Sequence, residues 1–232
     1  MRAGLFAEMN SAEPIRLRAS GLVDRTEYRA ACHSCRRPRA VCYCSLIEPF
    51  ESEPRFIILI QPREAKHRLG TGRMAHLCLR NSVLLEGVDF SQDVRVNREL
   101  QSPAVFPVLL YPSNDAINLS RQSPAARAAL VPAGRKLVVF VLDGTWKSVR
   151  KMLRLNHNLA SLPAICFEPP SPSTYRIRRQ PKFHCYSTIE AIHYVVDLFT
   201  PGGNEGSVSH RPHDNLRTVF NLVIDRQLAY SR

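Results

Sequence analysis

Four cysteines stand close together near the start of the 232-residue chain, as Cys-x-x-Cys, six residues, then Cys-x-Cys. Two tight pairs joined by a short loop can supply the four tetrahedral thiolates that Zn²⁺ prefers. The alternatives are reduced, unligated cysteines or a redox dithiol. We predict a structural zinc site, because four sulfur ligands leave no open coordination position. The predicted ligands are Cys32, Cys35, Cys42 and Cys44.

A second group with chemical potential is the run Asp143-Gly144-Thr145-Trp146, which directly follows the most apolar segment of the chain. These residues also have a purely structural interpretation: Asp143 or Thr145 caps a helix, Gly144 makes the turn and Trp146 packs in the core. Ligands of parallel α/β sheets bind beyond the carboxyl ends of the strands. We therefore predict that this turn lines a small-molecule site.

Two further segments are basic and contain residues suited to ligand binding. Between Glu168 and Glu190 there is no acidic residue, and arginines stand beside Tyr175. Such a loop can hold phosphates and stack a base, or it is simply a solvated basic loop. In residues 61–76, Gly70 and Gly72 would let the backbone approach a ligand closely, although an exposed basic loop explains that segment equally well.

The elements that must position these residues follow from the apolar pattern. Runs of branched apolar residues predict strands at 56–60, 82–86, 105–110, 137–142 and 164–167, although Pro107 is awkward in a central strand. Amphipathic spacing predicts helices near 74–78, from Trp146 for about three turns, from a capping box at Ser187 through 199, and from about 214. This alternation predicts an α/β fold with a mostly parallel sheet and helices on both faces.

The composition narrows the function class. The formal charge of +12 and a pI near 9.8 favour a polyanionic partner, with nucleic acid first. The longest apolar run, 137–142, is far too short for a membrane span, and the first twenty residues do not resemble a secretion signal. We expect a cytoplasmic protein in which Cys78, Cys166 and Cys185 are small core residues.

Several ordered motifs together carry a family resemblance from Cys32 to about Phe220. They are the cysteine pairs, Gly70-Thr71-Gly72-Arg73, Asp143-x-Thr145-Trp146, Ser173-x-Tyr175-x-x-Arg178 and Ser187-Thr188-x-Glu190-Ala191. The chain resembles the DTW-domain proteins, tRNA-uridine aminocarboxypropyltransferases related to the SPOUT group of knotted α/β enzymes. The resemblance implies a SPOUT-like trefoil knot, and it does not explain the first thirty residues. We expect three regions: an N-terminal extension (1–30), a four-cysteine zinc module (31–48) and a SPOUT-like DTW catalytic domain (49–232).

The resemblance also implies an activity: transfer of the 3-amino-3-carboxypropyl group from S-adenosylmethionine to the imino nitrogen of a tRNA uridine, with release of methylthioadenosine. Asp143 is then the candidate general base, or it holds the donor's ammonium or orients the uracil. The competing interpretations are a SPOUT-type RNA methyltransferase and a non-catalytic, zinc-stapled RNA-binding protein.

The predicted site residues combine the motifs of the resemblance with the residues at strand ends, and the tRNA contacts are predicted from the basic segments. The catalytic residues would be Asp143, Thr145 and Trp146. The residues that bind the S-adenosylmethionine would be Leu110, Tyr111, Leu142, Asp143, Gly144, Ser173, Tyr175, Arg178, Ser187 and Thr188. The tRNA would contact Arg36, Arg37, Arg63, Arg68, Arg73, Lys147, Arg150, Lys151, Arg154, Arg176 and Arg179.

Overall fold

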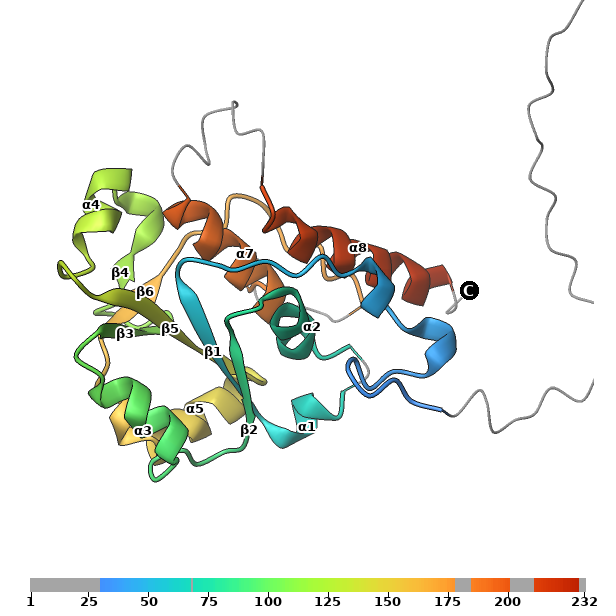
Figure 1. Ribbon diagram of the computed structural model, residues 1–232, viewed down its shortest axis with the longest axis horizontal. Coiled ribbons are helices and arrows are strands. Elements are labelled where there is room, and N and C mark those ends of the chain that lie inside the picture. The colour runs from blue at the N-terminus through green and yellow to red at the C-terminus, as the bar shows by residue number, and fades with distance from the viewer. Residues whose placement is uncertain (1–29, 68, 178–184, 201–210, 230–232) are drawn as a thin grey trace, which may run out of the picture.

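The computed structural model describes residues 30–67, 69–177, 185–200 and 211–229. Its centre is a six-stranded sheet in the order β2-β1-β5-β3-β6-β4, and every neighbouring pair of strands is parallel (Figure 1). The strands are β1 (Arg55–Ile60), β2 (Val83–Glu86), β3 (Val105–Leu110), β4 (Ile117–Asn118), β5 (Lys136–Asp143) and β6 (Ala164–Cys166). The predicted parallel α/β sheet is therefore confirmed. Of its six strands, only the short edge strand β4 was not predicted from the sequence.

The central strands are β1, β5 and β3, and their apolar runs explain this position. Ile57 to Ile60 are at most 1% exposed, because helices cover both faces of the sheet. Pro107 fits in β3 because of where β6 begins. The backbone amides of Leu109 and Tyr111 donate hydrogen bonds to the β6 side of β3. The nitrogen of Pro107 faces the same side, but pairing with β6 begins only at Leu109, so the missing N–H of Pro107 breaks no hydrogen bond between strands.

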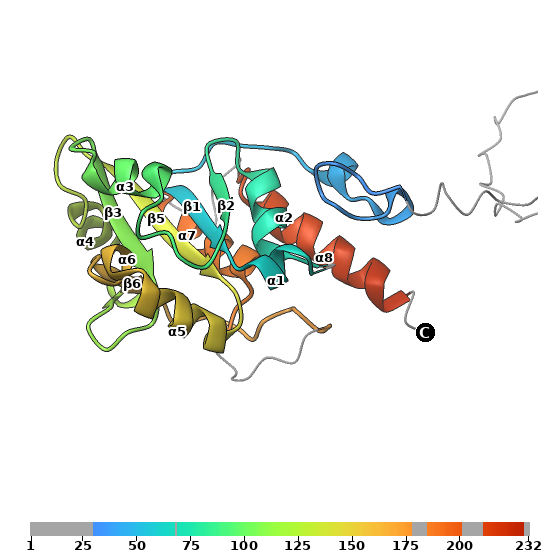
Figure 2. The same ribbon diagram turned by 90° about the horizontal axis from the view of Figure 1, so that it is seen from below.

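Two layers of helices cover the sheet. Figures 1 and 2 show α2, α7 and α8 on one face and α3, α5 and α6 on the other. Each face of the sheet packs against its helices in a separate hydrophobic core, and successive strand residues point alternately into the two cores. Phe56 and Ile58 point toward α2, α7 and α8, whereas Ile57 and Leu59 point toward the opposite helices. The helices are α1 (Pro62–Ala65), α2 (Thr71–Cys78), α3 (Val94–Gln101), α4 (Pro124–Ala129), α5 (Trp146–Leu155), α6 (His157–Ala160), α7 (Thr188–Phe199) and α8 (Asp214–Ala229).

The cysteine-rich segment lies beside α2 and α8 at one end of the molecule (Figure 2). Cys35 and Tyr43 are buried in the same core cluster as residues of these two helices. Asn215 of α8 accepts a hydrogen bond from the Glu48 amide at 3.1 Å and donates one to the Leu46 carbonyl at 3.2 Å. The segment is therefore joined to the α/β layer by apolar packing and by hydrogen bonds.

Part of the prediction falls outside the described residues. This applies to most of the expected N-terminal extension (1–30) and to Arg68, Arg178 and Arg179. Among the residues that the structure describes, no helix has both the length and the apolar character to cross a membrane.

Candidate active site

A cavity of about 360 Å³ opens at the carboxyl ends of β5, β3 and β6. This volume lies within the range of small-molecule sites. The start of α2 and the start of α7 complete its walls. The lining includes Thr71, Leu110, Tyr111, Leu142, Asp143, Gly144, Thr145, Trp146, Cys166, Phe167, Tyr175, Tyr186, Ser187 and Thr188. Most of the residues predicted to bind the ligand therefore do meet around one cavity.

Asp143 is the last residue of β5 and is only 7% exposed. Its Oδ2 accepts a hydrogen bond from the amide of Gly72 at 3.1 Å, and its Oδ1 accepts one from the Thr188 hydroxyl at 2.7 Å. Gly72 and Thr188 lie in the first turns of α2 and α7, where the helix dipole favours a negative charge. The carboxylate is therefore fixed between two helix N-termini.

Gly72 allows this arrangement because it has no side chain. A Cβ at this position would lie 2.2 Å from Asp143 Oδ2 and 2.9 Å from its Cγ. We expected the glycines of this loop to let the backbone approach a ligand. Within the described residues, Gly72 instead makes room for the carboxylate of Asp143.

Thr145 and Trp146 have different surroundings from Asp143. Thr145 caps α5, since its hydroxyl accepts a hydrogen bond from the Ser148 amide at 3.2 Å. Trp146 is 38% exposed, so the interpretation of this residue as a core anchor is wrong. Its ring lies at the cavity with that of Tyr111, at 6.4 Å between centroids and an interplanar angle of 54°. Val149 and Met152 form the buried face of α5 instead.

The ionisable groups around the cavity are unevenly distributed. Among the described residues that line it, Asp143 is the only carboxylate, and there is no Lys, Arg or His. The rest of the lining is apolar, aromatic or hydroxyl-bearing, together with the thiol of Cys166, which is partly buried and lines this cavity. A ligand in this cavity would therefore meet aromatic rings, hydroxyl groups and one carboxylate among the described residues.

The segment from Ser173 to Tyr175 forms one side of the site. Tyr175 is 5% exposed, donates a hydrogen bond to the Leu69 carbonyl at 3.3 Å and packs edge-on against Phe220. Ser173 was predicted to contact the ligand but is absent from the cavity lining, and its hydroxyl donates to Glu190 at 2.8 Å. From the sequence, Glu190 was predicted as part of a capping box and of the motif Ser187-Thr188-x-Glu190-Ala191, with no partner outside α7. Its contacts with Ser173 and Thr174 depend on tertiary structure.

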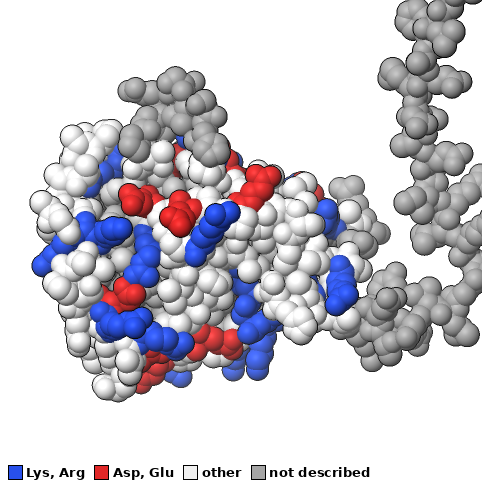
Figure 3. Space-filling view, in the orientation of Figure 1, with Lys and Arg blue, Asp and Glu red and all other residues white. Residues whose placement is uncertain are grey.

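The predicted tRNA-contacting residues do not form one continuous patch. Four lie together on α5, where they are exposed and make no ion pair with any described residue; this basic face of α5 comprises Lys147, Arg150, Lys151 and Arg154. Arg36 pairs with Glu86 at 3.4 Å, and Arg176 pairs with Asp225. The face seen in Figure 3 carries Lys and Arg beside Asp and Glu.

The other predicted contacts are divided between surface and interior. Arg63 is exposed at the start of α1. Arg37 is 8% exposed and donates to Gln227 of α8 at 3.3 Å, so it joins the cysteine-rich segment to the core. Arg73 is partly buried, and burial together with the nearby charge of Arg36 lowers its pKa. Arg37 and Arg73 therefore support the packing of this end of the molecule.

The four predicted zinc ligands converge, and their sulfur atoms all lie within 4.8 Å of one another. Cys32 and Cys44 are separated by 3.7 Å between Sγ atoms, as are Cys35 and Cys42. A tetrahedral ion with Zn–S bonds of about 2.3 Å separates its sulfurs by about 3.8 Å, whereas a disulfide needs about 2.05 Å. The donor set and its spacing fit a structural zinc ion.

The thiols of this cluster differ in their environments. Hydrogen bonds from the Cys35 and Ser34 amides lower the pKa of Cys32 to about 6, while burial raises the pKa of Cys35 and Cys44. For comparison, Cys78 lies in the apolar core as predicted, and burial raises its pKa to about 12. Within the cluster, a bound cation would stabilise the thiolates that burial disfavours.

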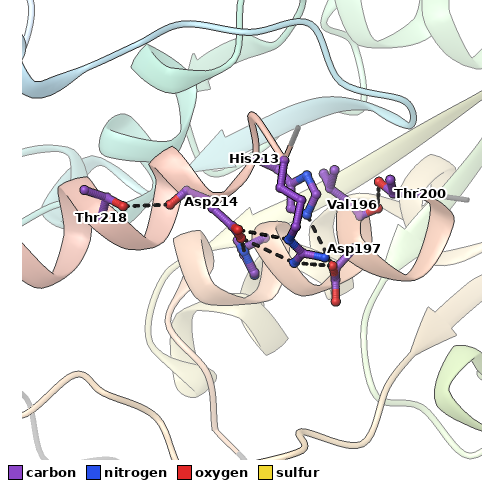
Figure 4. A network of polar contacts seen from close by, with 8 residues as sticks. Val196, Asp197, Thr200, His213, Asp214 and Thr218 are labelled. Carbon is purple, nitrogen blue, oxygen red and sulfur yellow. Dashed lines mark hydrogen bonds and ion pairs between the residues drawn. The ribbon is translucent and has the colours of Figure 1, made fainter. Parts of the chain in front are cut away.

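A second polar cluster joins α7 to the start of α8 (Figure 4). His193 Nε2 lies 2.8 Å from Asp214 Oδ1, and Arg211 binds both Asp214, at 2.9 Å, and Asp197, at 2.6 Å. His213, 2% exposed, lies 3.2 Å from Asp197. His193, His213 and Asp214 are close enough to share an ion, but the Arg211 guanidinium already supplies the positive charge between the carboxylates. This α7–α8 network is therefore a structural connection.

Comparisons with known proteins identify a family and several relatives of this chain. The family model "DTW domain" matches residues 29–228. A tRNA-uridine aminocarboxypropyltransferase 2 of Drosophila melanogaster is 30% identical over 174 residues, which cover 72% of this chain and 65% of that protein. The mouse protein of the same name is 28% identical, covering 76% and 58%. A tRNA-uridine aminocarboxypropyltransferase A of Arabidopsis thaliana is 23% identical, covering 78% and 77%.

The chain thus spans about three fifths of the length of the two animal relatives, and no solved structure matches it. The family match includes both the four cysteines and the cavity residues that follow β5. The chain belongs to the DTW-domain family.

Proposed function

We propose that this protein transfers the 3-amino-3-carboxypropyl group of S-adenosylmethionine to the imino nitrogen of a uridine in tRNA and releases methylthioadenosine. The relatives' names supply the reaction class. The observation that carries the proposal is the cavity at the carboxyl end of β5, whose described lining combines one buried carboxylate with aromatic walls. Such a cavity suits a donor with a sulfonium, an ammonium and an adenine ring.

The sulfonium of the donor makes the adjacent carbon of the aminocarboxypropyl arm electrophilic. The uracil imino nitrogen forms the new bond to that carbon, the carbon–sulfur bond breaks, and its electron pair stays on the sulfur of methylthioadenosine. The imino proton leaves to a base. Tyr111 and Trp146 would hold rings by stacking, because they are the aromatic pair at the end of β3 and the start of α5.

We assign Asp143 the role of holding the positive charge of the donor. Its carboxylate already accepts hydrogen bonds from Gly72 and Thr188 at helix N-termini, which favour the negative charge. The alternative role, general base for the imino proton, requires this group to take up a proton. Asp143→Asn separates the two roles, since loss of an electrostatic partner weakens donor binding, whereas loss of a base lowers turnover with binding unchanged.

For the tRNA we propose that the basic face of α5 contacts phosphates next to the cavity, because α5 begins at the cavity residue Trp146. Phosphate contacts supply affinity and salt dependence, while the choice of uridine depends on RNA shape and an unstacked base. We further propose a structural zinc ion in the four-cysteine cluster, a module at 31–48 beside a catalytic domain at 49–232, and a SPOUT-like trefoil knot at the cavity.

The reaction is tested by incubating the protein with tRNA and S-adenosylmethionine and analysing the small-molecule product. Methylthioadenosine, with a tRNA mass gain of one aminocarboxypropyl group, is the expected result. S-adenosylhomocysteine would instead identify a methyltransferase and refute the proposal. A protein with tRNA affinity but no binding of S-adenosylmethionine in a thermal-shift assay would be an RNA-binding protein without this activity.

A further inference from the structure

Glu190, in the first turn of α7, binds far more groups than a helix cap requires. Its side chain is 8% exposed. Oε2 accepts hydrogen bonds from the Ser187 amide at 2.9 Å, the Ser187 hydroxyl at 2.6 Å and the Ser173 hydroxyl at 2.8 Å. Oε1 accepts from the Thr174 amide at 2.7 Å and the Thr174 hydroxyl at 3.1 Å. Within the described residues, the donors on Glu190 thus come from 173–174 and from Ser187.

Each of these two segments includes or directly adjoins residues that line the cavity. Ser187 and Thr188 line it at the start of α7, and Tyr175 lines it directly after Thr174. Thr188 in turn donates to Asp143 Oδ1 at 2.7 Å. Glu190 does not line the cavity, so it acts on the site only through these neighbours. It fixes the distance between the two walls and the placement of the hydroxyl that holds Asp143.

We propose that Glu190 is a positioning residue for donor binding, whose buried carboxylate joins the Ser173–Tyr175 wall to the α7 wall and aligns Thr188 with Asp143. The assignment of the ligand rests on the proposed function, because S-adenosylmethionine is the probe. The physical linkage does not depend on that assignment, since every contact involved lies within the protein.

The carboxylate is required because a backbone amide donates on each side. Thr174 N donates to Oε1 and Ser187 N donates to Oε2. Hydroxyl donors can rotate and become acceptors, but a backbone N–H cannot. A glutamine at this position turns an NH₂ group toward one of the two amides, so either the hydrogen bond to the loop or the helix cap is broken. Glu190→Gln is therefore a disruptive change despite its similar shape.

Trp146 is the only tryptophan of the chain and lines the cavity, so its fluorescence reports donor binding there. We expect Glu190→Gln to raise the Kd for S-adenosylmethionine by about tenfold or more, because the segment that loses its hydrogen bond shifts and displaces the adjoining cavity residue, Tyr175 or Thr188. Glu168→Gln is the matched control: this carboxylate binds Arg121 at the surface, outside the cavity lining, and its substitution should leave the Kd unchanged. Equal Kd values for the wild type and Glu190→Gln, with a lowered Tm, would reduce Glu190 to a helix cap and overturn the proposal.

A second variant and a second measurement separate loss of the linkage from a general loss of stability. Ser173→Ala combined with Thr174→Val keeps the helix cap and the 174 amide but removes two hydroxyl donors from Glu190, and should weaken donor binding. An unchanged Kd for this variant also counts against the proposal. Hydrogen exchange of the Thr174 and Ser187 amides reads the linkage without any ligand: at least one of the two should exchange faster in Glu190→Gln, and both should be normal in Glu168→Gln. If the wild type does not bind S-adenosylmethionine, the proposed function fails, and this exchange result alone decides whether the linkage exists.

Discussion

Gly72→Ala is a small substitution that acts directly on the catalytic candidate. The new Cβ would lie 2.2 Å from Asp143 Oδ2, 2.9 Å from Cγ and 3.2 Å from Cβ. An ordinary contact of this kind is about 3.5 Å or more, so the carboxylate has to move by about 1 Å. Such a movement disrupts the hydrogen bonds from Gly72 N and from the Thr188 hydroxyl.

The sign of the stability change distinguishes this contact from helix propensity. Gly72 lies in the first turn of α2, and replacing a helical glycine by alanine normally stabilises a protein by about 0.5–1 kcal/mol. A hydrogen bond to a charged group contributes about 1.5–3 kcal/mol. Even if only one of the two hydrogen bonds to Asp143 is broken, this loss exceeds the gain in helix propensity. Gly72→Ala should therefore destabilise the protein by about 1–2 kcal/mol, whereas helix propensity alone would stabilise it.

The assay combines urea unfolding with donor titration followed by Trp146 fluorescence. Gly72→Ala should lose stability and raise the Kd for S-adenosylmethionine by at least about tenfold, because Asp143 is displaced. Gly70→Ala is the matched control, since the nearest atom to its Cβ is a carbonyl oxygen at 3.3 Å and Asp143 is not among its neighbours. A Gly72→Ala variant that is more stable than the wild type and binds the donor normally would refute the role of the Gly72–Asp143 contact.

Three further predictions concern other parts of the molecule. Purified protein should contain one zinc ion per chain, and Cys35→Ser should lose it whereas Cys166→Ser keeps it; equal metal content in both would contradict the four-cysteine site. Neutralising the basic face of α5 with glutamines should weaken tRNA binding and flatten its salt dependence by about 0.7–0.9 in log–log slope for each phosphate that is no longer neutralised, with donor affinity unchanged. Burial lowers the pKa of His193 below 6.5, so the free energy of unfolding should fall as pH drops below that value. Burial alone would raise the pKa of Asp214, but bonds from Arg211 and His193 lower it from 3.8 to about 2, so a second loss of stability should follow between these values. In urea unfolding measured against pH, this loss should be smaller in Asp214→Asn than in the wild type, and the remainder comes from Asp89, Asp93 and Asp197, whose pKa values are also lowered.

The sheet could be predicted from the sequence because its strands carry continuous branched apolar runs. Leu137 to Leu142 predicted a strand buried on both faces, and β5 occupies the centre of the sheet. The capping box at Ser187 correctly marked the start of α7. By contrast, β4 pairs through only two residues, a length that gives no periodic pattern. The exposure of Trp146 was missed because spacing along α5 cannot show that one end of the helix borders a cavity.

Local patterns of apolar residues, caps and ligand spacing were sufficient to predict the parallel α/β class, the four convergent cysteines and the position of the turn after β5 at a cavity. Which groups meet around Asp143 follows only from the folded chain. Gly72 lies 71 residues from Asp143 in the sequence, and Thr188 lies 45 residues away. Likewise Glu190 binds Ser173 and Thr174, which precede it by 17 and 16 residues. Contacts between distant segments depend on how the helices pack on the sheet, and no local pattern encodes that packing.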